Sequence, residues 1–270
     1  MHIKIKSPWL IKPDTKVKLS KLETKADGGF NSPEAAAAVL VKHQRKLQKL
    51  QEVLYASQQR SVLIVLQGMD TAGKDGTISH IFEGINPQGC DVASFKVPTP
   101  LEARHDFLWR CHAKAPAKGM IVVFNRSHYE QVLSPQVHGH LSGKEVKESL
   151  AQINQFEQML ADQGTLILKF FLNISREEQT ARLKARIDDP KKHWKLSAGD
   201  FAERKFWPQY ADAYEDILSE TSKKHAPWFA IPANHKWYRN LAISEVLEQA
   251  FEGMKLEYPK PTVDASTLTL

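Results

Sequence analysis

The residues best suited to chemistry form a glycine-rich segment, residues 68–77, with the sequence Gly-Met-Asp-Thr-Ala-Gly-Lys-Asp-Gly-Thr. Two glycines separated by four residues and followed by lysine let the backbone curl so that its N–H groups face an anion. The positive end of the next helix and the ammonium of Lys74 point to the same place. The segment therefore predicts a phosphate-binding loop. The residues expected to bind phosphate here are Gly68, Thr71, Ala72, Gly73, Lys74, Asp75, Gly76 and Thr77.

This loop departs from the usual nucleotide-binding pattern at two positions. Asp75 stands where a Ser or Thr usually follows the lysine and holds Mg²⁺, so either Thr77 or a carboxylate has to hold the metal. Asp70 lies inside the loop, where its charge would repel bound phosphates unless a cation lay between them. Its presence predicts a Mg²⁺ ion, or an acid–base task, at the loop.

A second polar cluster, residues 125–130 (Asn-Arg-Ser-His-Tyr-Glu), follows an apolar run. In a doubly wound sheet, ligands bind where such strands end. A carboxylate at the first position would hold Mg²⁺, but the residue here is Asn125, so Glu130 or Asp70 has to supply the charge. Arg126 matches phosphate in a bidentate way. The three residues between them, including His128, either bind ligand or form a hydrogen-bonded loop that supports their neighbours.

A third cluster is cationic. Arg182 and Arg186 lie four residues apart, and therefore on one face of a predicted helix. The helix breaks at residues 188–190, and the run 191–195 (Lys-Lys-His-Trp-Lys) follows. We expect a mobile lid that closes over phosphates. The alternative is a solvated helix face.

The elements that have to position these clusters alternate along the chain. The five apolar runs predicted to be strands are 62–66, 90–95, 120–124, 165–172 and 228–232. Helices are expected between them, and the alternation predicts the parallel, doubly wound, three-layer α/β sandwich of a P-loop kinase, with an N-terminal helical extension and a helical lid. The helices expected outside the loop are 33–56, about 99–115, 143–162, one opened by Ser175, one spanning 201–218 with an aromatic stripe, and one ending near 254.

One domain is expected over residues 1–270. An N-terminal arm that wraps the body and a first helix occupy 1–60, the core occupies 61–255 with the lid at about 182–200, and a flexible tail follows at 256–270. Cys90 and Cys111 have no metal-ligand spacing and are expected to be small core residues in a reducing cytosol.

Charge and hydropathy limit the partners. The formal charge of +6 and the isoelectric point near 9.1 favour an anionic partner but are modest for a nucleic-acid binder, so no nucleic acid is expected. No apolar run approaches the roughly 18 residues that span a bilayer, and the N-terminus lacks a signal-peptide core. We therefore expect a cytoplasmic protein without a membrane partner.

Several motifs in combination resemble polyphosphate kinase family 2 over roughly residues 10–255. The motifs are Gly-x-Asp-x-x-Gly-Lys-x-Gly at 68–76, Phe-Asn-Arg-Ser-His-Tyr-Glu at 124–130, the run 182–195, His-Ala-Pro-Trp at 225–228 and Asn-His-Lys-Trp-Tyr-Arg at 234–239. Many members have Phe-Asp-Arg-Ser-Trp-Tyr-Asn at the second motif. With Asn125, His128 and Glu130 this chain is similar to the class III members, which phosphorylate both AMP and ADP.

The resemblance implies inorganic polyphosphate as phosphoryl donor, Mg²⁺ as cofactor, AMP, ADP or ATP as nucleotide partner, a reversible reaction and a homo-oligomer, dimer or tetramer. The residues that it makes catalytic are Asp70, Lys74, Arg126, Glu130, Arg182 and Arg186. The residues that it assigns to the nucleotide are Asn125, Arg126, His128 and Glu130, and those assigned to the metal are Asp70 and Asn125. Lys96, Arg104, Lys191, Lys192 and Lys195 are expected to line a groove for a long polyanion, since a mononucleotide needs far fewer cations.

Two other functions fit the same motifs. An ATP-dependent nucleotide or small-molecule kinase would share the fold and differ in its donor. A non-catalytic polyanion-binding module would use the same basic groove without turnover. Asp70 favours catalysis, because a carboxylate weakens anion binding unless the chemistry needs it.

Overall fold

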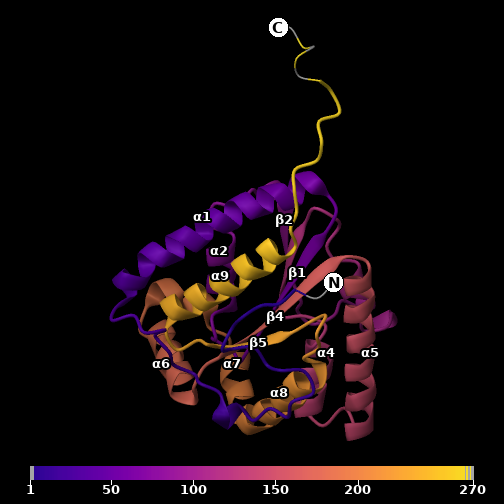
Figure 1. The fold of residues 1–270 in the computed structure, drawn as a ribbon. Helices are drawn as coiled ribbons and strands as arrows, with labels where there is room; N and C mark the ends of the chain where they lie inside the picture. The colour runs from indigo at the N-terminus through magenta and orange to yellow at the C-terminus, as the bar shows by residue number, and fades with distance from the viewer. Residues whose placement is uncertain (1–2, 265, 267, 269–270) are drawn as a thin grey trace.

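The computed structural model describes residues 3–264, 266 and 268, and its described strands form one parallel sheet in the order β2-β3-β1-β4-β5 (Figure 1). The strands are β1 (Ser61–Gln67), β2 (Cys90–Ser94), β3 (Ile121–Asn125), β4 (Thr165–Asn173) and β5 (Trp228–Pro232). All seven residues of β1 are buried, as expected for a central strand covered on both faces. The predicted α/β fold and its five strands are confirmed.

The strand order decides where the site lies. β1 pairs in parallel with β3 through Leu66 and Asn125, and β2 pairs with β3 on the other side. The carboxyl ends of β1 and β3 are therefore neighbours. The loop after β1 and the turn after β3, which carry the two predicted polar clusters, meet at one edge of the sheet.

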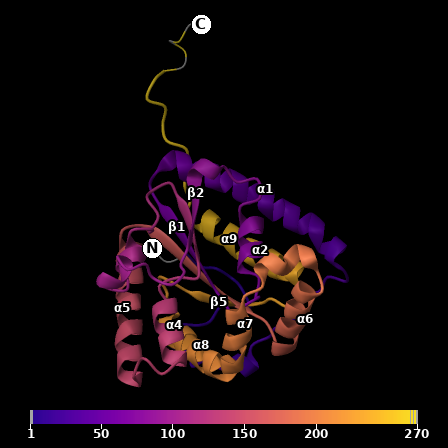
Figure 2. The ribbon, with the colours of Figure 1, turned by 180° about the vertical axis from the view of Figure 1, so that it is seen from behind.

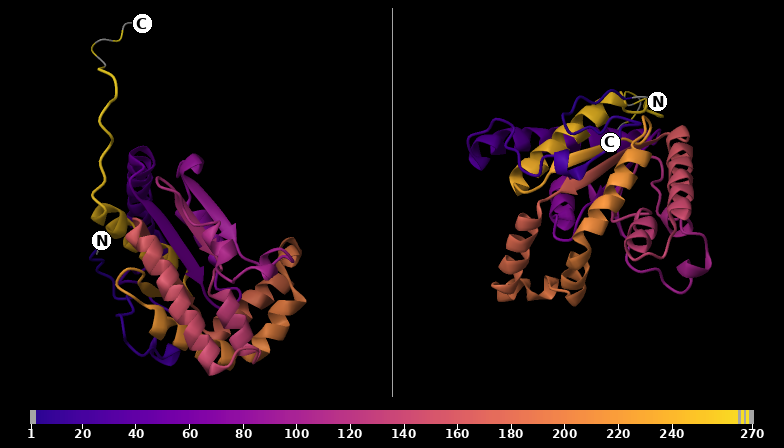
Figure 3. Two further views of the ribbon diagram at one scale, coloured as in Figure 1. Left: turned by 90° about the vertical axis from the view of Figure 1, so that its right-hand side faces the viewer. Right: turned by 90° about the horizontal axis from the view of Figure 1, so that it is seen from below.

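Helices cover both faces of the sheet (Figure 1, Figure 2). On one face α1 (Pro33–Ser57) packs against α9 (Lys236–Gly253), which also contacts α2 (Lys74–Ile81). On the other face lie α4 (Glu130–Val137), α5 (Gly143–Asp162) and α8 (Trp207–Thr221). Figure 3 shows α6 (Arg176–Ile187) and α8 projecting beyond the sheet, joined by a short segment that holds η4 (Pro190–Lys195) and α7 (Ala198–Glu203).

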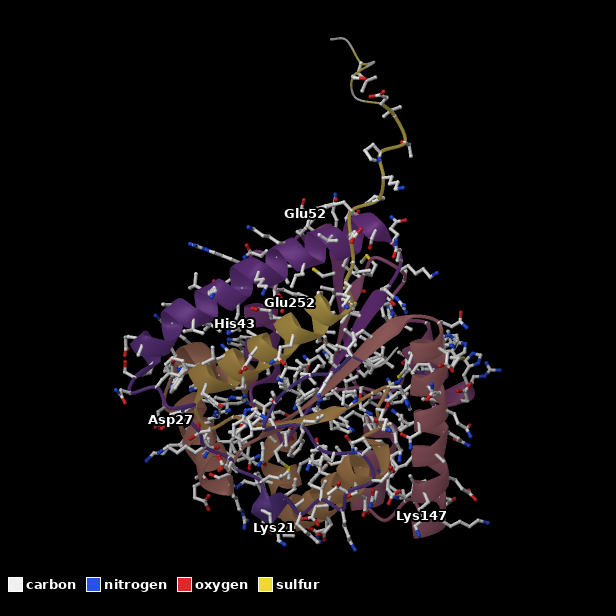
Figure 4. The ribbon with its side chains drawn as sticks, viewed as in Figure 1. Lys21, Asp27, His43, Glu52, Lys147 and Glu252 are labelled. Atoms are coloured by element: carbon white, nitrogen blue, oxygen red, sulfur yellow. The ribbon has the colours of Figure 1, made fainter. Side chains whose placement is uncertain are left out.

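Ion pairs join the two long helices of the first face. His43 Nδ1 lies 2.6 Å from Glu248 Oε2, and Lys46 contacts both Glu248 and Glu252. Figure 4 labels His43 on α1 and Glu252 on α9 at this boundary. The basic face of α1 is thus partly engaged in packing within the chain.

The helix predicted at about 99–115 is wrong. Its capping box forms, since Glu102 N donates to Thr99 Oγ1 (3.2 Å) and Thr99 N donates to Glu102 Oε2 (2.7 Å). The chain makes only the 3₁₀ turn η3 (Glu102–Arg104) and then becomes extended at His105. Asp106 accepts a hydrogen bond from Leu108 N (3.0 Å), and a separate short helix, α3 (Trp109–His112), follows. The local cap at 106 interrupts the helix.

The aromatic helix predicted at 201–218 is also wrong as a single element. It is divided into α7, the 3₁₀ turn η5 (Arg204–Phe206) and α8. Pro208 lies in the first turn of α8, where its missing N–H costs no hydrogen bond, whereas within a continuous helix it would interrupt the ladder. The break turns the chain at the junction between the lid segment and the core. A further helix, α4, was not predicted.

The N-terminal arm wraps the body as predicted. Ile11 N donates to Trp228 O (2.9 Å) and Ala230 N donates to Trp9 O (2.8 Å), so the arm forms an antiparallel bridge to β5 and covers the edge of the sheet. Residues 256–264 extend away from the body as coil (Figure 1). The predicted flexibility of the tail falls partly on residues 265, 267 and 269–270, which lie outside the described residues. The division into one domain stays a prediction.

Among the described residues, no helix combines the length and the apolar character that crossing a bilayer requires.

Candidate active site

The phosphate-binding loop connects β1 to α2. Its backbone is left-handed at Gly68 (φ 150°), Thr71 (φ 67°) and Gly73 (φ 103°). A Cβ atom on Gly68 would lie 2.7 Å from Leu172 O, and one on Gly73 would lie 2.1 Å from Arg239 Nη1. Close approach to the backbone and conformation both require glycine at 68, and the left-handed backbone favours glycine at 73.

Lys74 is the first residue of α2, and its side chain folds back over the loop. Nζ donates to Gly68 O at 2.8 Å. Burial lowers the pKa of Lys74, while Asp70 nearby opposes that shift. An ammonium held in this way lacks a full counter-charge, and a phosphate group would supply it.

Arg126 connects the loop to the first turn of α4. Nη2 lies 3.0 Å from Asp70 Oδ1, and Nη1 lies 3.8 Å from Glu130 Oε2. The residue holds a left-handed conformation (φ 61°), and its backbone N–H donates to Leu66 O (3.2 Å), which fixes the start of the turn. Burial raises the pKa of Glu130, with Arg126 opposing the shift. One guanidinium therefore lies between two carboxylates at the centre of the site.

The two aspartates of the loop fit a Mg²⁺ site. Asp70 and Asp75 both line the open cleft described below, and Asn125 Nδ2 donates to Asp75 Oδ1 (2.8 Å). No cluster of three or more His, Cys, Asp or Glu side chains suited to a metal exists in the described part of the chain. Mg²⁺ is commonly bound through one or two carboxylates together with substrate phosphates, so this donor set fits it. The hydroxyl of Thr77 donates to Gly73 O (3.1 Å) and is buried, and Thr77 lines neither cavity described below, whereas Asp70 and Asp75 face the cleft.

Two cavities meet at this centre. The larger is an open cleft with about 1860 Å³ of empty space, and nine basic side chains and three carboxylates line it. The basic residues are Lys74, Lys96, Arg126, Arg182, Arg186, Lys192, Lys195, Lys236 and Arg239. The smaller cavity, which has far less free space than the cleft, lies among α4, α6, η5 and α8. Asp70, Lys74 and Arg126 line both.

The smaller cavity differs in character from the cleft. Aromatic rings of Trp207, Tyr210 and Tyr214 line it together with the carboxylates of Glu130 and Glu203. Tyr210 OH donates to Glu203 Oε2 (2.6 Å). The cleft therefore suits a polyanion, whereas the smaller cavity combines stacking surfaces with acceptors for hydrogen bonds.

The structure contradicts a mobile lid role for Arg182. Its guanidinium makes five hydrogen bonds, using every N–H that it has. The acceptors are Glu178 Oε1 (2.7 Å), Thr71 O (2.9 Å), Ala72 O (2.9 Å), Ala233 O (2.6 Å) and Asn234 O (3.1 Å). The side chain is 9% exposed. Arg182 therefore fixes the phosphate loop to the chain after β5 instead of closing over a ligand.

Three other basic residues of the lid, Arg186, Lys192 and Lys195, line the cleft. Arg186 Nη1 contacts Lys195 O and Asp200 Oδ2, both at 3.3 Å, and is only partly buried. Lys192 and Lys195 line the cleft on η4, but Lys191 does not. Arg104 is exposed on η3 and lines neither cavity, so the structure does not bring it to the cleft and its place in the groove stays a prediction. Ala72 is buried and also lines neither.

His128 lies in the core, which contradicts its predicted contact with a nucleotide. It is fully buried, with Nε2 at 3.1 Å from Glu157 Oε1, and burial lowers its pKa. Ser127 Oγ accepts a hydrogen bond from Gln67 Nε2 (3.1 Å), and Tyr129 OH donates to Glu157 Oε1 (2.8 Å). The alternative interpretation, a hydrogen-bonded loop that supports Arg126 and Glu130 at its ends, fits this geometry.

A buried ion pair anchors that turn. Lys169 Nζ on β4 lies 2.6 Å from Glu157 Oε2 on α5, 2.9 Å from Tyr129 OH and 2.7 Å from Thr221 O. All three ammonium hydrogens therefore have acceptors. Burial lowers the pKa of Lys169 to about 8, and Glu157 opposes that shift.

The sequence interpretation missed several residues of the site. Lys236 and Arg239, in the first turn of α9, line the cleft, and Glu203, Arg204, Trp207 and Tyr210 line the smaller cavity. The run 234–239 is basic and aromatic and follows a strand, as residues 125–130 do. Its place at the carboxyl end of β5 could have indicated a role in binding.

The model of the polyphosphate kinase 2 (PPK2) family matches residues 31–259. The chain belongs to the polyphosphate kinase 2 family. An AMP/ADP-polyphosphate phosphotransferase from Meiothermus ruber is 45% identical over 263 residues, 97% of this chain and 98% of that protein. An ADP-polyphosphate phosphotransferase from Rhodopseudomonas palustris is 44% identical over 97% of this chain and 94% of its own length.

A solved member of the PPK2 family has the same fold. The crystal structure of polyphosphate kinase 2 from Arthrobacter aurescens TC1 matches with a TM-score of 0.92 and 41% identity, over 98% of this chain and 96% of that one. The family assignment agrees with the resemblance seen in the motifs and with the P-loop kinase architecture.

Proposed function

We propose that this member of the PPK2 family transfers a phosphoryl group from inorganic polyphosphate to AMP and ADP, reversibly and with Mg²⁺. The observation that carries the proposal is the junction of the two cavities at Asp70, Lys74 and Arg126. A cleft lined by nine cations suits a chain of phosphates, and the adjoining cavity offers aromatic rings to a nucleoside. The relatives named AMP/ADP- and ADP-polyphosphate phosphotransferase support this assignment.

In the proposed reaction, an oxygen of the acceptor's terminal phosphate attacks the end phosphorus of the donor chain. The new P–O bond forms as the bond to the shortened polyphosphate breaks, and the leaving chain keeps the electron pair. Lys74 and Arg126 neutralise charge on the phosphoryl group in transit. Asp70 and Asp75 would hold Mg²⁺, which would supply further neutralisation of the phosphate charge. Glu130 is proposed to influence the use of AMP, because it lies where the smaller cavity meets Arg126.

The test is a donor comparison with purified protein and Mg²⁺. AMP and ADP are each supplied with polyphosphate or, for AMP, with ATP, and the nucleotide products are measured. We expect products with polyphosphate, and we expect Lys74→Ala to lower kcat by about 10²–10³-fold through loss of charge stabilisation. Turnover only with ATP would identify the ATP-dependent kinase, and binding without turnover would identify the polyanion-binding module. Unchanged turnover in Lys74→Ala would refute the assignment of the loop.

We also propose a cytoplasmic homo-oligomer that binds neither nucleic acid nor membrane. Light scattering of the purified protein measures the oligomeric state. Binding assays with duplex DNA and lipid vesicles test the two excluded partners.

A further inference from the structure

Arg239 projects from the first turn of α9 onto the phosphate-binding loop. A Cβ atom on Gly73 would lie 2.1 Å from its Nη1, and one on Gly76 would lie 3.6 Å from its Nη2. The residue is 3% exposed overall, yet it contributes to the lining of the open cleft. A nearly buried guanidinium is therefore held against the loop, with access to the cleft.

This guanidinium has no counter-charge among the described residues. Nε and Nη2 donate to Asn240 Oδ1 at 3.1 and 2.8 Å, Nη1 donates to no described side chain or carbonyl, and no carboxylate forms a salt bridge with it. The neighbouring charge is Arg182, which has the same sign. Burial and Arg182 lower the pKa of Arg239 to about 10. Buried charges are ordinarily paired, so this arrangement is costly unless an anion binds there.

Arg182 shows what a structural arginine looks like at the same place. Its five N–H groups all have protein acceptors, and Glu178 neutralises it. Among the described residues, the guanidinium of Arg239 hydrogen-bonds only to the side-chain amide of Asn240. The difference indicates that Arg182 supports the loop, whereas Arg239 is available to a ligand.

The position of Arg239 places it in the cleft that is proposed to bind the phosphoryl donor. Arg239 and Lys236 line the open cleft but not the smaller cavity, whereas Asp70, Lys74 and Arg126 line both. Transfer is proposed at the residues common to both cavities. Arg239 therefore lies beside the part of the cleft that holds phosphates not taking part in transfer.

We infer that Arg239, assisted by Lys236, binds a non-transferred phosphate of the polyphosphate donor. The inference rests on the proposed function, because it takes polyphosphate as the occupant of the cleft. It assigns a binding role to a residue outside the loop. It also predicts that the unpaired charge of Arg239 lowers the stability of the free protein and raises its affinity for polyphosphate.

The experiment replaces Arg239 by Met, which keeps the apolar stem and removes the charge. Isothermal titration calorimetry measures the Kd for long-chain polyphosphate and for tripolyphosphate, steady-state kinetics measures KM for polyphosphate and for ADP, and thermal unfolding measures Tm without ligand. Lys147→Ala is the control, since it removes one positive charge from the exposed face of α5, away from the cleft (Figure 4).

We expect the Kd and KM for the long chain to rise about tenfold or more in Arg239→Met, the loss of one charge-assisted contact. The rise should be smaller with tripolyphosphate, KM for ADP should stay unchanged, and Tm should equal or exceed that of the parent protein. Lys147→Ala should alter none of these. Arg239→Lys should recover part of the affinity, because it restores the charge without the planar fork.

Two outcomes overturn the inference. A lower Tm with unchanged Kd for polyphosphate would make Arg239 a packing residue, and a rise confined to KM for ADP would assign it to the acceptor. Failure of the proposed function is distinguishable, since the parent protein would then make no nucleotide from polyphosphate. Calorimetry would still report whether removal of Arg239 weakens polyphosphate binding.

Discussion

Two clusters of buried charge in this protein are built in opposite ways. The pair of Glu157 and Lys169 is neutral overall, and hydrogen bonds saturate its ammonium group. Arg182 and Arg239 are two cations side by side, and only Arg182 is saturated. The first cluster joins α5 to β4 in the core, and the second borders the cleft. The paired charges of Glu157 and Lys169 stabilise the fold. The unpaired charge of Arg239 indicates a place where an anion binds.

The largest expected effect comes from breaking the compensated pair. Lys169→Met should lower the free energy of unfolding by about 3–5 kcal/mol, because Glu157 is left buried without its partner. The double variant Glu157→Gln/Lys169→Met should recover a substantial part of this loss, since neither charge remains. Urea denaturation of both variants measures the difference. With Glu157→Gln measured as well, a loss in the double variant equal to the sum of the two single-variant losses would show that the pair is not coupled.

A smaller effect is expected at the saturated arginine. Arg182→Lys keeps the charge but cannot reach five acceptors, so we expect a loss of about 1.5–3 kcal/mol in the free energy of unfolding. Polyphosphate KM should also rise, because Thr71 and Ala72 lose their contact with the guanidinium. Arg239→Met serves as the matched control, with no loss of stability. An Arg182→Lys variant as stable as the parent protein would contradict the structural role assigned to Arg182.

The smallest expected effect is on how the free energy of unfolding depends on pH in the acid range. Burial favours a raised pKa at Glu157, but Lys169 and His128 hold it below its ordinary value. As the pH falls, Glu157 therefore becomes protonated in the unfolded chain before it does so in the folded chain. The resulting stability is present near neutral pH and is lost progressively as the pH falls from about 5 through the folded-state pKa. Urea midpoints should fall more steeply in this range for the parent than for Glu157→Gln. Parallel curves would contradict the prediction.

Local sequence carried enough information for the sheet and the centre of the site. The strands follow from continuous apolar runs such as 62–66, and the loop follows from glycines and a lysine at fixed spacing. Lys74, Asp70 and Arg126 meet because β1 and β3 are neighbours in the sheet, and the alternation of strands and helices already implied a parallel arrangement with ligands at this edge.

Other features depended on partners far along the chain. Arg182 was predicted to be mobile, but its acceptors include Thr71 and Ala233, which only the folded chain brings near. His128 is buried because Glu157 lies beneath it. The Thr99 cap formed without the expected helix, since the competing cap at Asp106 began a new turn. Patterns of residue type identified the polar clusters but not which of their members face inward.

The N-terminal arm, which bridges to β5, is also linked by hydrogen bonds to Arg182 beside the phosphate loop. The arm continues to Thr24, whose carbonyl accepts a hydrogen bond from Asn234 N (2.9 Å), and Asn234 O in turn accepts from Arg182. Residues 9–24 thus connect β5 to Asn234, and Arg182 connects Asn234 to the phosphate loop. Removal of the N-terminal arm is expected to lower the affinity for polyphosphate, although it removes no residue that lines the cleft.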